Sequence, residues 1–171
     1  MKQQTSRLEP ARLLRELWRE ISAALNESNH TLAGMQTGAS KNAAFEIVFD
    51  GGSLGNPGKG YGSYEITSGG AVLRHHREEY GNNITNNQAE YLTLIRALEW
   101  LDTLLEGDRT GSTVLINGDS KLVLNQVQGL WKIKAEPLRP LAQRIRDLLK
   151  GYKKSSLVWH ARANSVKRLG H

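Results

Sequence analysis

Residues 44–60 read AFEIVFDGGSLGNPGKG, and this stretch decides the fold. Aromatic or aliphatic side chains recur at every second position from Phe45 to Phe49, which is the period of a strand with one buried face. The strand ends on Asp50 and runs into a glycine-rich turn that lasts through Gly60. The sequence therefore predicts a carboxylate at the end of a strand, beside a tightly folded loop.

The rest of the chain alternates between strand and helix patterns. Residues 61–67 and 71–79 flank Ser68-Gly69-Gly70 and predict a hairpin that follows the first strand. A helix over residues 86–105 carries a stripe of leucines at helical spacing. The further elements that we expect are a strand at 113–117, helices at 120–128 and 138–149, a strand at 156–160 and a helix at 162–169. This order predicts an α/β fold with helices packed on a mixed sheet.

A separate segment precedes this domain. Residues 10–25 place leucine, isoleucine and tryptophan at helical spacing, which predicts an amphipathic helix. Residues 26–42 are rich in serine, asparagine, glycine and threonine, a composition typical of a linker. We therefore expect residues 1–42 to form an N-terminal helical extension and linker, and residues 43–171 to form one domain.

The chain is basic and contains no cysteine. Its formal net charge of +6 favours a polyanionic partner such as nucleic acid, although scattered surface lysines would give the same balance. The absence of cysteine excludes disulfides and zinc sites built on cysteines. No apolar run reaches membrane-spanning length, and residues 1–7 lack the apolar core of a signal peptide. We therefore expect a cytoplasmic protein that does not associate with membranes.

Three carboxylates occupy positions where sites form in α/β folds. Asp50 ends the first strand, Glu90 lies near the start of the first long helix, and Asp119 follows the strand at 113–117. Strand ends converge at one edge of such a sheet, and hard divalent cations relieve the repulsion among acids gathered there. Taken singly, each residue also has a structural explanation: a turn for Asp50, an N-cap for Asp119 and a favourable helix-dipole contact for Glu90.

Three motifs around these carboxylates resemble those of type 1 ribonucleases H, in the family's order and at compatible spacing. They are DGGSLGNPG at 50–58, TNNQAEY at 85–91, and GDSKLV at 118–123 followed by Gln126, Gly129 and Trp131. The resemblance covers residues 45–169 and implies a five-stranded mixed sheet flanked by helices. It also implies an endonuclease that hydrolyses the RNA strand of RNA–DNA hybrids by two-metal-ion catalysis and leaves 5′-phosphomonoesters.

The resemblance assigns roles to particular residues. The catalytic, metal-binding residues would be Asp50, Glu90, Asp119 and Asn164, which would hold two ions of Mg²⁺ or Mn²⁺. The substrate-binding residues would be Gly51, Gly52, Ser53, Thr85, Asn86, Asn87 and Trp131. For Asn86 and Asn87 the alternative is a helix start made of residues that cap well. For Trp131 the alternative is packing in the core.

The fourth metal position departs from the family pattern. The family carries an Asp in an Ala-Asp pair within the last helix, but no acidic residue follows Asp147 in this chain. Matching that pair to Ala163-Asn164 puts Asn164 at the fourth position, where an amide oxygen is a legitimate ligand for Mg²⁺ or Mn²⁺. A rival alignment puts Arg168 or Lys167 there, and neither can hold a metal.

Two other functions are compatible with parts of this pattern. A non-catalytic RNA–DNA hybrid-binding domain could have kept the groove and lost the chemistry, and Asn164 is the feature that permits it. A transposase or resolvase on the same fold would act on DNA, but the motif at 85–91 disfavours it. The expected partner is therefore an RNA–DNA hybrid, and we expect the protein to act as a monomer.

Overall fold

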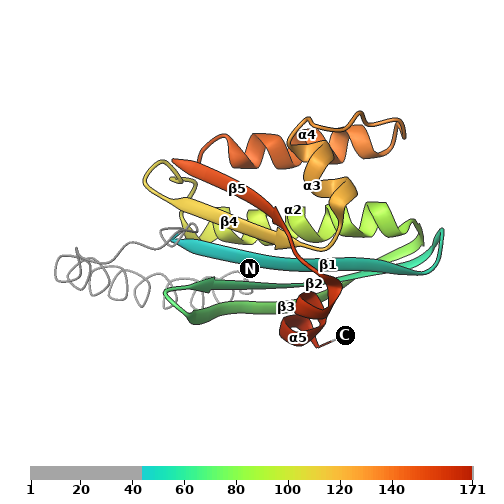
Figure 1. Cartoon of the computed structure of the whole chain (residues 1–171), viewed down its shortest axis with the longest axis horizontal. Coiled ribbons are helices and arrows are strands. Elements are labelled where there is room, and N and C mark those ends of the chain that lie inside the picture. The colour runs from blue at the N-terminus through green and yellow to red at the C-terminus, as the bar shows by residue number, and fades with distance from the viewer. Residues whose placement is uncertain (1–43, 171) are drawn as a thin grey trace, which may run out of the picture.

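The computed structural model describes residues 44–170, and five strands in that range form one mixed sheet. The strands are β1 (Phe45–Gly55), β2 (Gly58–Ser68), β3 (Ala71–Ile84), β4 (Thr113–Gly118) and β5 (Lys154–Trp159). Their spatial order is β3-β2-β1-β4-β5, as Figure 1 shows. β1, β2 and β3 are antiparallel neighbours, whereas β4 and β5 run parallel to β1. The expected five-stranded mixed sheet is confirmed, and the helix predicted at 10–25 lies outside the described residues.

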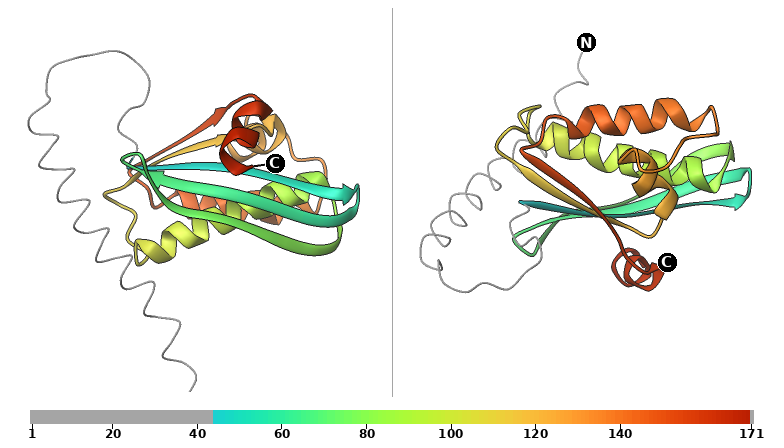
Figure 2. Two further views of the ribbon diagram at one scale, coloured as in Figure 1. Left: turned by 90° about the horizontal axis from the view of Figure 1, so that it is seen from below. Right: turned by 45° about the horizontal axis from the view of Figure 1, so that its top comes forward.

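Helices lie on both faces of this sheet. They are α2 (Asn86–Leu104), α3 (Lys121–Val127), α4 (Leu138–Leu149) and α5 (Arg162–Leu169). α2 packs on β1 and β2, and α4 packs on α2, so both lie on one side. α5 lies on the opposite side, where it contacts β1 and β2 (Figure 2). Within residues 44–170, no helix is both long enough and apolar enough to cross a membrane.

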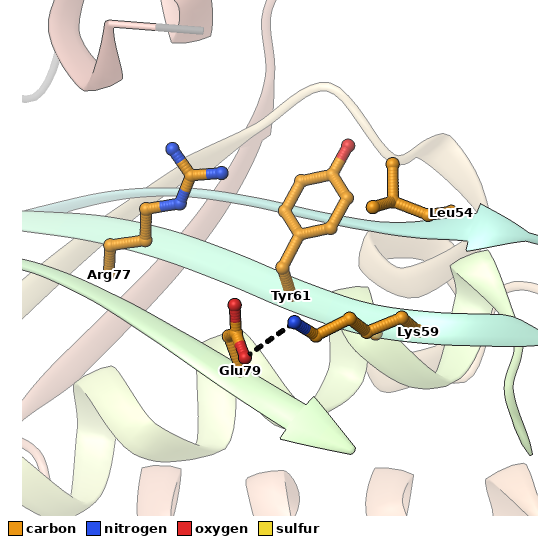
Figure 3. A pocket seen from close by; sticks show the side chains of 6 residues that line it. Leu54, Lys59, Tyr61, Arg77 and Glu79 are labelled. Carbon is orange, nitrogen blue, oxygen red and sulfur yellow. Dashed lines mark ion pairs between the residues drawn. The ribbon is translucent and has the colours of Figure 1, made fainter. Parts of the chain in front are cut away.

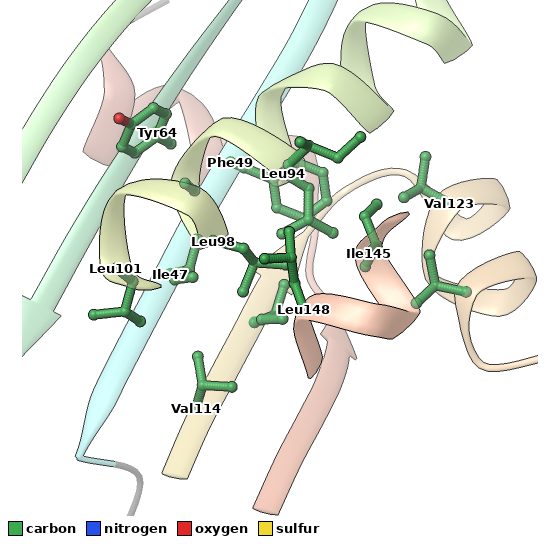
Figure 4. Packing of buried hydrophobic residues seen from close by; sticks show 14 of the residues in the cluster. Ile47, Phe49, Tyr64, Leu94, Leu98, Leu101, Val114, Val123, Ile145 and Leu148 are labelled. Atoms are coloured by element: carbon green, nitrogen blue, oxygen red, sulfur yellow. The ribbon is translucent and has the colours of Figure 1, made fainter. Parts of the chain in front are cut away.

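The hydrophobic core lies between the sheet and the helices α2, α3 and α4. Figure 4 shows β1 contributing Ile47 and Phe49, which face the leucine stripe of α2. Leu94, Leu98 and Leu101 of that stripe are completely or almost completely buried, as their helical spacing predicts. α4 closes the layer with Ile145 and Leu148, and β4 with Val114. Because β1 is covered by α2 and lies between β2 and β4, its middle, where Asp50 lies, is a rigid place for a site.

The first hairpin is longer than the sequence predicts. The expected glycine-rich turn through Gly60 is wrong in extent, because β1 stays paired with β2 from Glu46↔Thr67 to Gly55↔Gly58. Only Asn56 and Pro57 lie outside the ladder. Glycines fit a ladder wherever close neighbours leave no room for side chains, so a glycine-rich run need not end a strand. β3 likewise extends to Ile84, just before α2.

The parallel pairing among β1, β4 and β5 stops at one level of the sheet. Phe49 of β1 pairs with Gly118 of β4, and Gly118 pairs with Trp159 of β5. The next residue on β1 is Asp50, and the next after β4 is Asp119. The carboxyl ends of parallel strands are where sites form in α/β sheets, so the fold itself brings these two carboxylates side by side.

Candidate active site

The three carboxylates predicted from the sequence meet at this edge of the sheet. One carboxylate oxygen from each of Asp50, Glu90 and Asp119 can be chosen so that all three lie within 4.8 Å of one another. Asp50 lies in β1, Asp119 directly follows β4, and Glu90 lies in the second turn of α2. The side chains of Asp50 and Asp119 are only 2% and 8% exposed. Carboxylates gathered this closely, and this deeply, need a cation or a proton between them.

Gly51 lets α2 bring Glu90 this close. A Cβ at Gly51 would lie 2.5 Å from the carbonyl carbon of Ala89 and from the backbone nitrogen of Glu90, a distance that no real side chain tolerates. The backbone of β1 therefore touches the backbone of α2 at the position before Glu90. The family resemblance assigns Gly51 to substrate binding, whereas the close contact seen here is with the protein's own helix.

Burial and like charge act together on Glu90. Burial is the largest cause that raises the pKa of Glu90 well above its ordinary value, and the carboxylates of Asp50 and Asp119 raise it further. Glu90 Oε2 and Asp119 Oδ2 are buried and have no hydrogen-bond partner among the described residues. Oxygen atoms that are buried, acidic and unsatisfied are the ligands that Mg²⁺ and Mn²⁺ prefer. The donor set therefore fits a hard divalent cation.

Arg162 is a functional candidate that the sequence analysis missed. It opens α5, and its guanidinium lies 3.8 Å from Asp50 Oδ2 and 3.9 Å from Asp119 Oδ2. It also lowers the pKa of Glu90. Its side chain is 66% exposed, so it covers the carboxylates from the solvent side. No sequence motif pointed to this contact, because it depends on where the β5–α5 connection places the first turn of α5.

The residue expected at the fourth metal position also lies on α5. Asn164 is exposed in the first turn of that helix, two residues after Arg162. Arg168 is engaged elsewhere, because it donates to Glu46 Oε1 and Glu65 Oε1, both at 2.8 Å. Glu46 lies at the far end of β1 from Asp50. These ion pairs commit Arg168 to Glu46 and Glu65, which disfavours the alignment that puts Arg168 at the fourth position.

Hydrogen bonds tie the last part of β1 and its turn to the start of α2. Asn86 Oδ1 accepts a 2.8 Å hydrogen bond from the backbone N–H of Ser53. The backbone N–H of Asn86 donates to Asn56 Oδ1 at 3.1 Å. Thr85 caps the helix in a reciprocal capping box with Gln88. Asn86 and Asn87 therefore do open the helix, as the alternative for them held, but Thr85 is the N-cap. The exposed side chain of Asn87 remains available to a ligand.

Gly52 faces a tyrosine instead of a helix. A Cβ there would lie 2.7 Å from the hydroxyl oxygen of Tyr61, so a larger residue would displace that ring. Figure 3 shows Tyr61 between Leu54 and Arg77 in a shallow hollow, with Lys59 and Glu79 paired at 2.9 Å beside it. The guanidinium of Arg77 lies 5.6 Å from the centre of the Tyr61 ring. The hollow thus lies between Leu54 of the first motif and residues of β2 and β3.

Trp131 lies on the surface rather than in the core. Its side chain is 49% exposed and borders a groove with Lys132, Arg139 and Gln143. Arg146 fixes the base of this groove by donating to the backbone oxygens of Gln126 and Val127. The interpretation of Trp131 as part of a basic and aromatic surface is therefore favoured over core packing.

Comparison with protein families and with sequences of known proteins agrees with the motifs. A model of the reverse transcriptase-like family matches residues 60–166. Ribonuclease HI of Halobacterium salinarum is 36% identical over 118 residues, which cover 68% of this chain and 56% of that protein. A bifunctional protein of Mycobacterium tuberculosis is 35% identical over 121 residues, which cover 70% of this chain and 32% of that protein. The match therefore spans between a third and somewhat more than half of these relatives.

Solved structures agree with the fold. The crystal structure of RNase H1 from Halobacterium salinarum has a TM-score of 0.63 at 34% identity, and the match covers 71% of this chain and 88% of that chain. LC11-RNase H1, isolated from compost and solved in complex with an RNA/DNA hybrid, has a TM-score of 0.65 at 32% identity. That match covers 72% of this chain and 89% of the other.

Proposed function

Because the chain belongs to the type 1 ribonuclease H family, we propose that it hydrolyses the RNA strand of RNA–DNA hybrids and leaves 5′-phosphomonoesters. The observation that carries this proposal is the buried cluster of Asp50, Glu90 and Asp119, with ligand atoms within 4.8 Å of one another. Each of the three belongs to a motif that resembles one of the family. LC11-RNase H1, the similar protein solved with a hybrid, supports the choice of substrate.

The carboxylates would hold two ions of Mg²⁺ or Mn²⁺. Such ions would activate the attacking water and stabilise the leaving oxygen of the phosphodiester. The role of the protein is to hold Asp50, Glu90 and Asp119 in place before metal arrives, which the contact between Gly51 and Ala89 does rigidly. Asn164 is proposed as a further oxygen ligand from α5. Arg162 must move aside, or turn toward the substrate phosphate, when the ions bind.

The start of α2 and the last part of β1, after Asp50, would position the RNA strand. Ser53, Asn86 and Asn87 lie beside the carboxylates on the β1–α2 side, and Ser53 and Asn86 are already joined by a hydrogen bond. Amide side chains can read the 2′-hydroxyl groups that distinguish RNA from DNA. Thr85 would contact the DNA strand, and the groove at Trp131 would receive a more distant part of the duplex.

Loss of a single carboxylate tests the proposal. Glu90→Gln and Asp119→Asn should each abolish cleavage of a labelled hybrid while leaving a folded protein that still binds it. Removing one of several buried like charges should not unfold the site, because the remaining charges then repel each other less. The measurements are hybrid cleavage with Mg²⁺ and then Mn²⁺, hybrid binding, and thermal melting. Turnover close to wild type in either variant would contradict the proposal.

A hybrid-binding domain without catalysis is the second candidate. Asn164 and the nearby Arg162 favour it, since both reduce the negative charge available to a metal. A pure binder, however, has no use for buried acids that face a polyanion. Wild-type protein that binds hybrid but cuts nothing with either metal would establish this alternative.

We also propose that the protein acts as a monomer in the cytoplasm, as its composition led us to expect. Size-exclusion chromatography with light scattering tests the first statement. Imaging of a tagged protein in cells tests the second.

A further inference from the structure

An exposed tryptophan stands next to the carboxylates, at the end of the neighbouring strand. Trp159 is the last residue of β5 and lies level with Gly118 of β4, the residue before Asp119. β4 and β5 end level with each other beside Phe49 and Asp50, while β1 continues past them to Gly55 (Figure 1). Trp159 therefore lies beside Asp119, on the β5 side of the carboxylates.

The indole ring is exposed but held in place. Its side chain is 48% exposed, whereas its Nε1–H donates a 3.1 Å hydrogen bond to the backbone oxygen of Asp119. The ammonium group of Lys121 lies 4.4 Å from the centre of the ring. Large aromatic rings are enriched where one face meets a partner and the polar edge is satisfied. A ring fixed in this way loses little conformational freedom when a ligand packs against it.

The charge around the ring selects the kind of ligand. Lys121 is exposed and lies over the ring, and the guanidinium of Arg162 lies 3.9 Å from Asp119 Oδ2, the residue whose backbone oxygen accepts the hydrogen bond of the ring. An apolar ring with a lysine against it and an arginine at the neighbouring carboxylates matches the sugar and phosphate of a nucleotide. An acidic protein surface could pair with the cations, but it would not explain why a fixed aromatic ring lies so close to the carboxylates. A nucleotide explains both features.

We propose that Trp159 and Lys121, which we call the Trp159 platform, bind a nucleotide of the RNA strand next to the scissile phosphate, on the β5 side. The indole packs against the ribose of that nucleotide, and Lys121 pairs with its phosphate. The inference rests on the proposed function, because the strand that crosses the carboxylates is the one that reaches the platform. It adds a binding position across the carboxylates from Ser53 and Asn86.

Two substitutions at Trp159 separate ligand contact from a purely structural role. Trp159→Ala removes both the ring and the hydrogen bond to Asp119, whereas Trp159→Phe keeps a ring and loses only the hydrogen bond. A contact role predicts that Trp159→Ala weakens hybrid binding about tenfold and Trp159→Phe by about threefold or less. A structural role in holding Asp119 predicts that both variants lower kcat equally and leave the hybrid Kd unchanged.

Binding is measured by fluorescence anisotropy of a labelled hybrid in EDTA, so that no cleavage occurs, and KM and kcat are then measured with metal. Lys121→Gln should reduce the slope of log Kd against log salt by about 0.7–0.9, because one phosphate contact is lost. Val72→Ala is the control, since Val72 is 58% exposed near the far end of β3 from the site. It should change neither Kd nor kcat. Thermal melting verifies that each variant is folded.

Shortening the RNA strand locates the contact. RNA strands truncated one nucleotide at a time on either side of the cleaved bond are annealed to one DNA strand and tested with wild type and Trp159→Ala. The tenfold difference should vanish once the nucleotide that packs on Trp159 is missing, and only on one side. Equal Kd values for wild type and Trp159→Ala on the full-length hybrid would overturn the inference. Failure of the wild type to cleave any hybrid would instead overturn the proposed function.

Discussion

At the scale of single residues, burial sets the behaviour of Glu90. Its pKa in the folded protein is raised well above the ordinary value of 4.5, first by burial and then by Asp50 and Asp119. Without metal, the folded state therefore keeps a proton that the unfolded chain releases above pH 4.5. Stability must fall as pH rises from that value through the raised pKa, and it stays lower beyond it.

Glu90→Gln should abolish this pH dependence. We expect the melting temperature of the wild type in EDTA to fall relative to that of the variant as pH rises above 4.5. Saturating Mg²⁺ should restore the wild type but not the variant, because a ligand that binds only the folded state stabilises it. Melting curves of both proteins across this range, with and without metal, decide the matter. If the melting temperatures of wild type and variant in EDTA changed in parallel with pH, folding would not raise the pKa of Glu90.

Arg162 is the second residue whose effect depends on the metal. Its guanidinium, 3.8 Å from Asp50 and 3.9 Å from Asp119, offsets part of the negative charge that attracts an ion. Arg162→Gln should therefore tighten Mn²⁺ binding by about threefold to tenfold, measured by calorimetry without substrate. Lys167→Gln makes the same charge change at an exposed position of the same helix. If both variants bind Mn²⁺ equally well, only overall charge matters and Arg162 has no local effect.

At the scale of elements, the approach of β1 to α2 sets the geometry of the site. Gly51→Ala would place a methyl group 2.5 Å from the backbone of Ala89 and Glu90, so the helix must move by roughly 1 Å. A displacement of that size costs on the order of 10²-fold in rate. We expect such a loss in hybrid cleavage, together with a lower melting temperature.

Gly111→Ala is the matched control for that variant. A Cβ at Gly111 meets no atom within 4 Å, and its backbone is not in the left-handed region. We expect cleavage and melting temperature within error of the wild type. A Gly51→Ala protein as active as Gly111→Ala would show that the contact between β1 and α2 does not position Glu90.

The helices and strands also show which parts of the structure can be predicted from the sequence. The sequence predicts all five strands and the helices after residue 85. Burial of one face of an element gives its apolar residues a regular spacing, and that spacing can be seen in the sequence. The carboxylates Asp50, Glu90 and Asp119 were predicted from motifs and do meet. The extent of the β1–β2 hairpin was missed, since glycines leave no periodic signal. Arg162 and Trp159 were missed because their contacts join the end of β5 and the start of α5 to residues far away in the chain.

At the scale of the whole molecule, positive charge lies at both ends of the short helix α3, which follows Asp119. Lys121 and Arg162 border the carboxylates on the β5 side, and Lys132 and Arg139 border the groove at Trp131 beyond the end of α3. The two groups lie at opposite ends of the short helix α3. A duplex that crosses the carboxylates can therefore touch both groups, and each phosphate it contacts releases condensed counterions.

Hybrid binding should consequently weaken steeply with salt, and the two groups should contribute separately. Each loss of one phosphate contact should reduce the slope of log Kd against log salt by about 0.7–0.9. Lys121→Gln and Lys132→Gln should each have this effect, and the double variant should show their sum, because the residues share no contacts. Anisotropy titrations at several salt concentrations measure all four proteins. If the slope of log Kd against log salt were the same for Lys132→Gln and the wild type, the duplex would not reach the groove at Trp131. The cations on the β5 side would then bind the duplex without that groove.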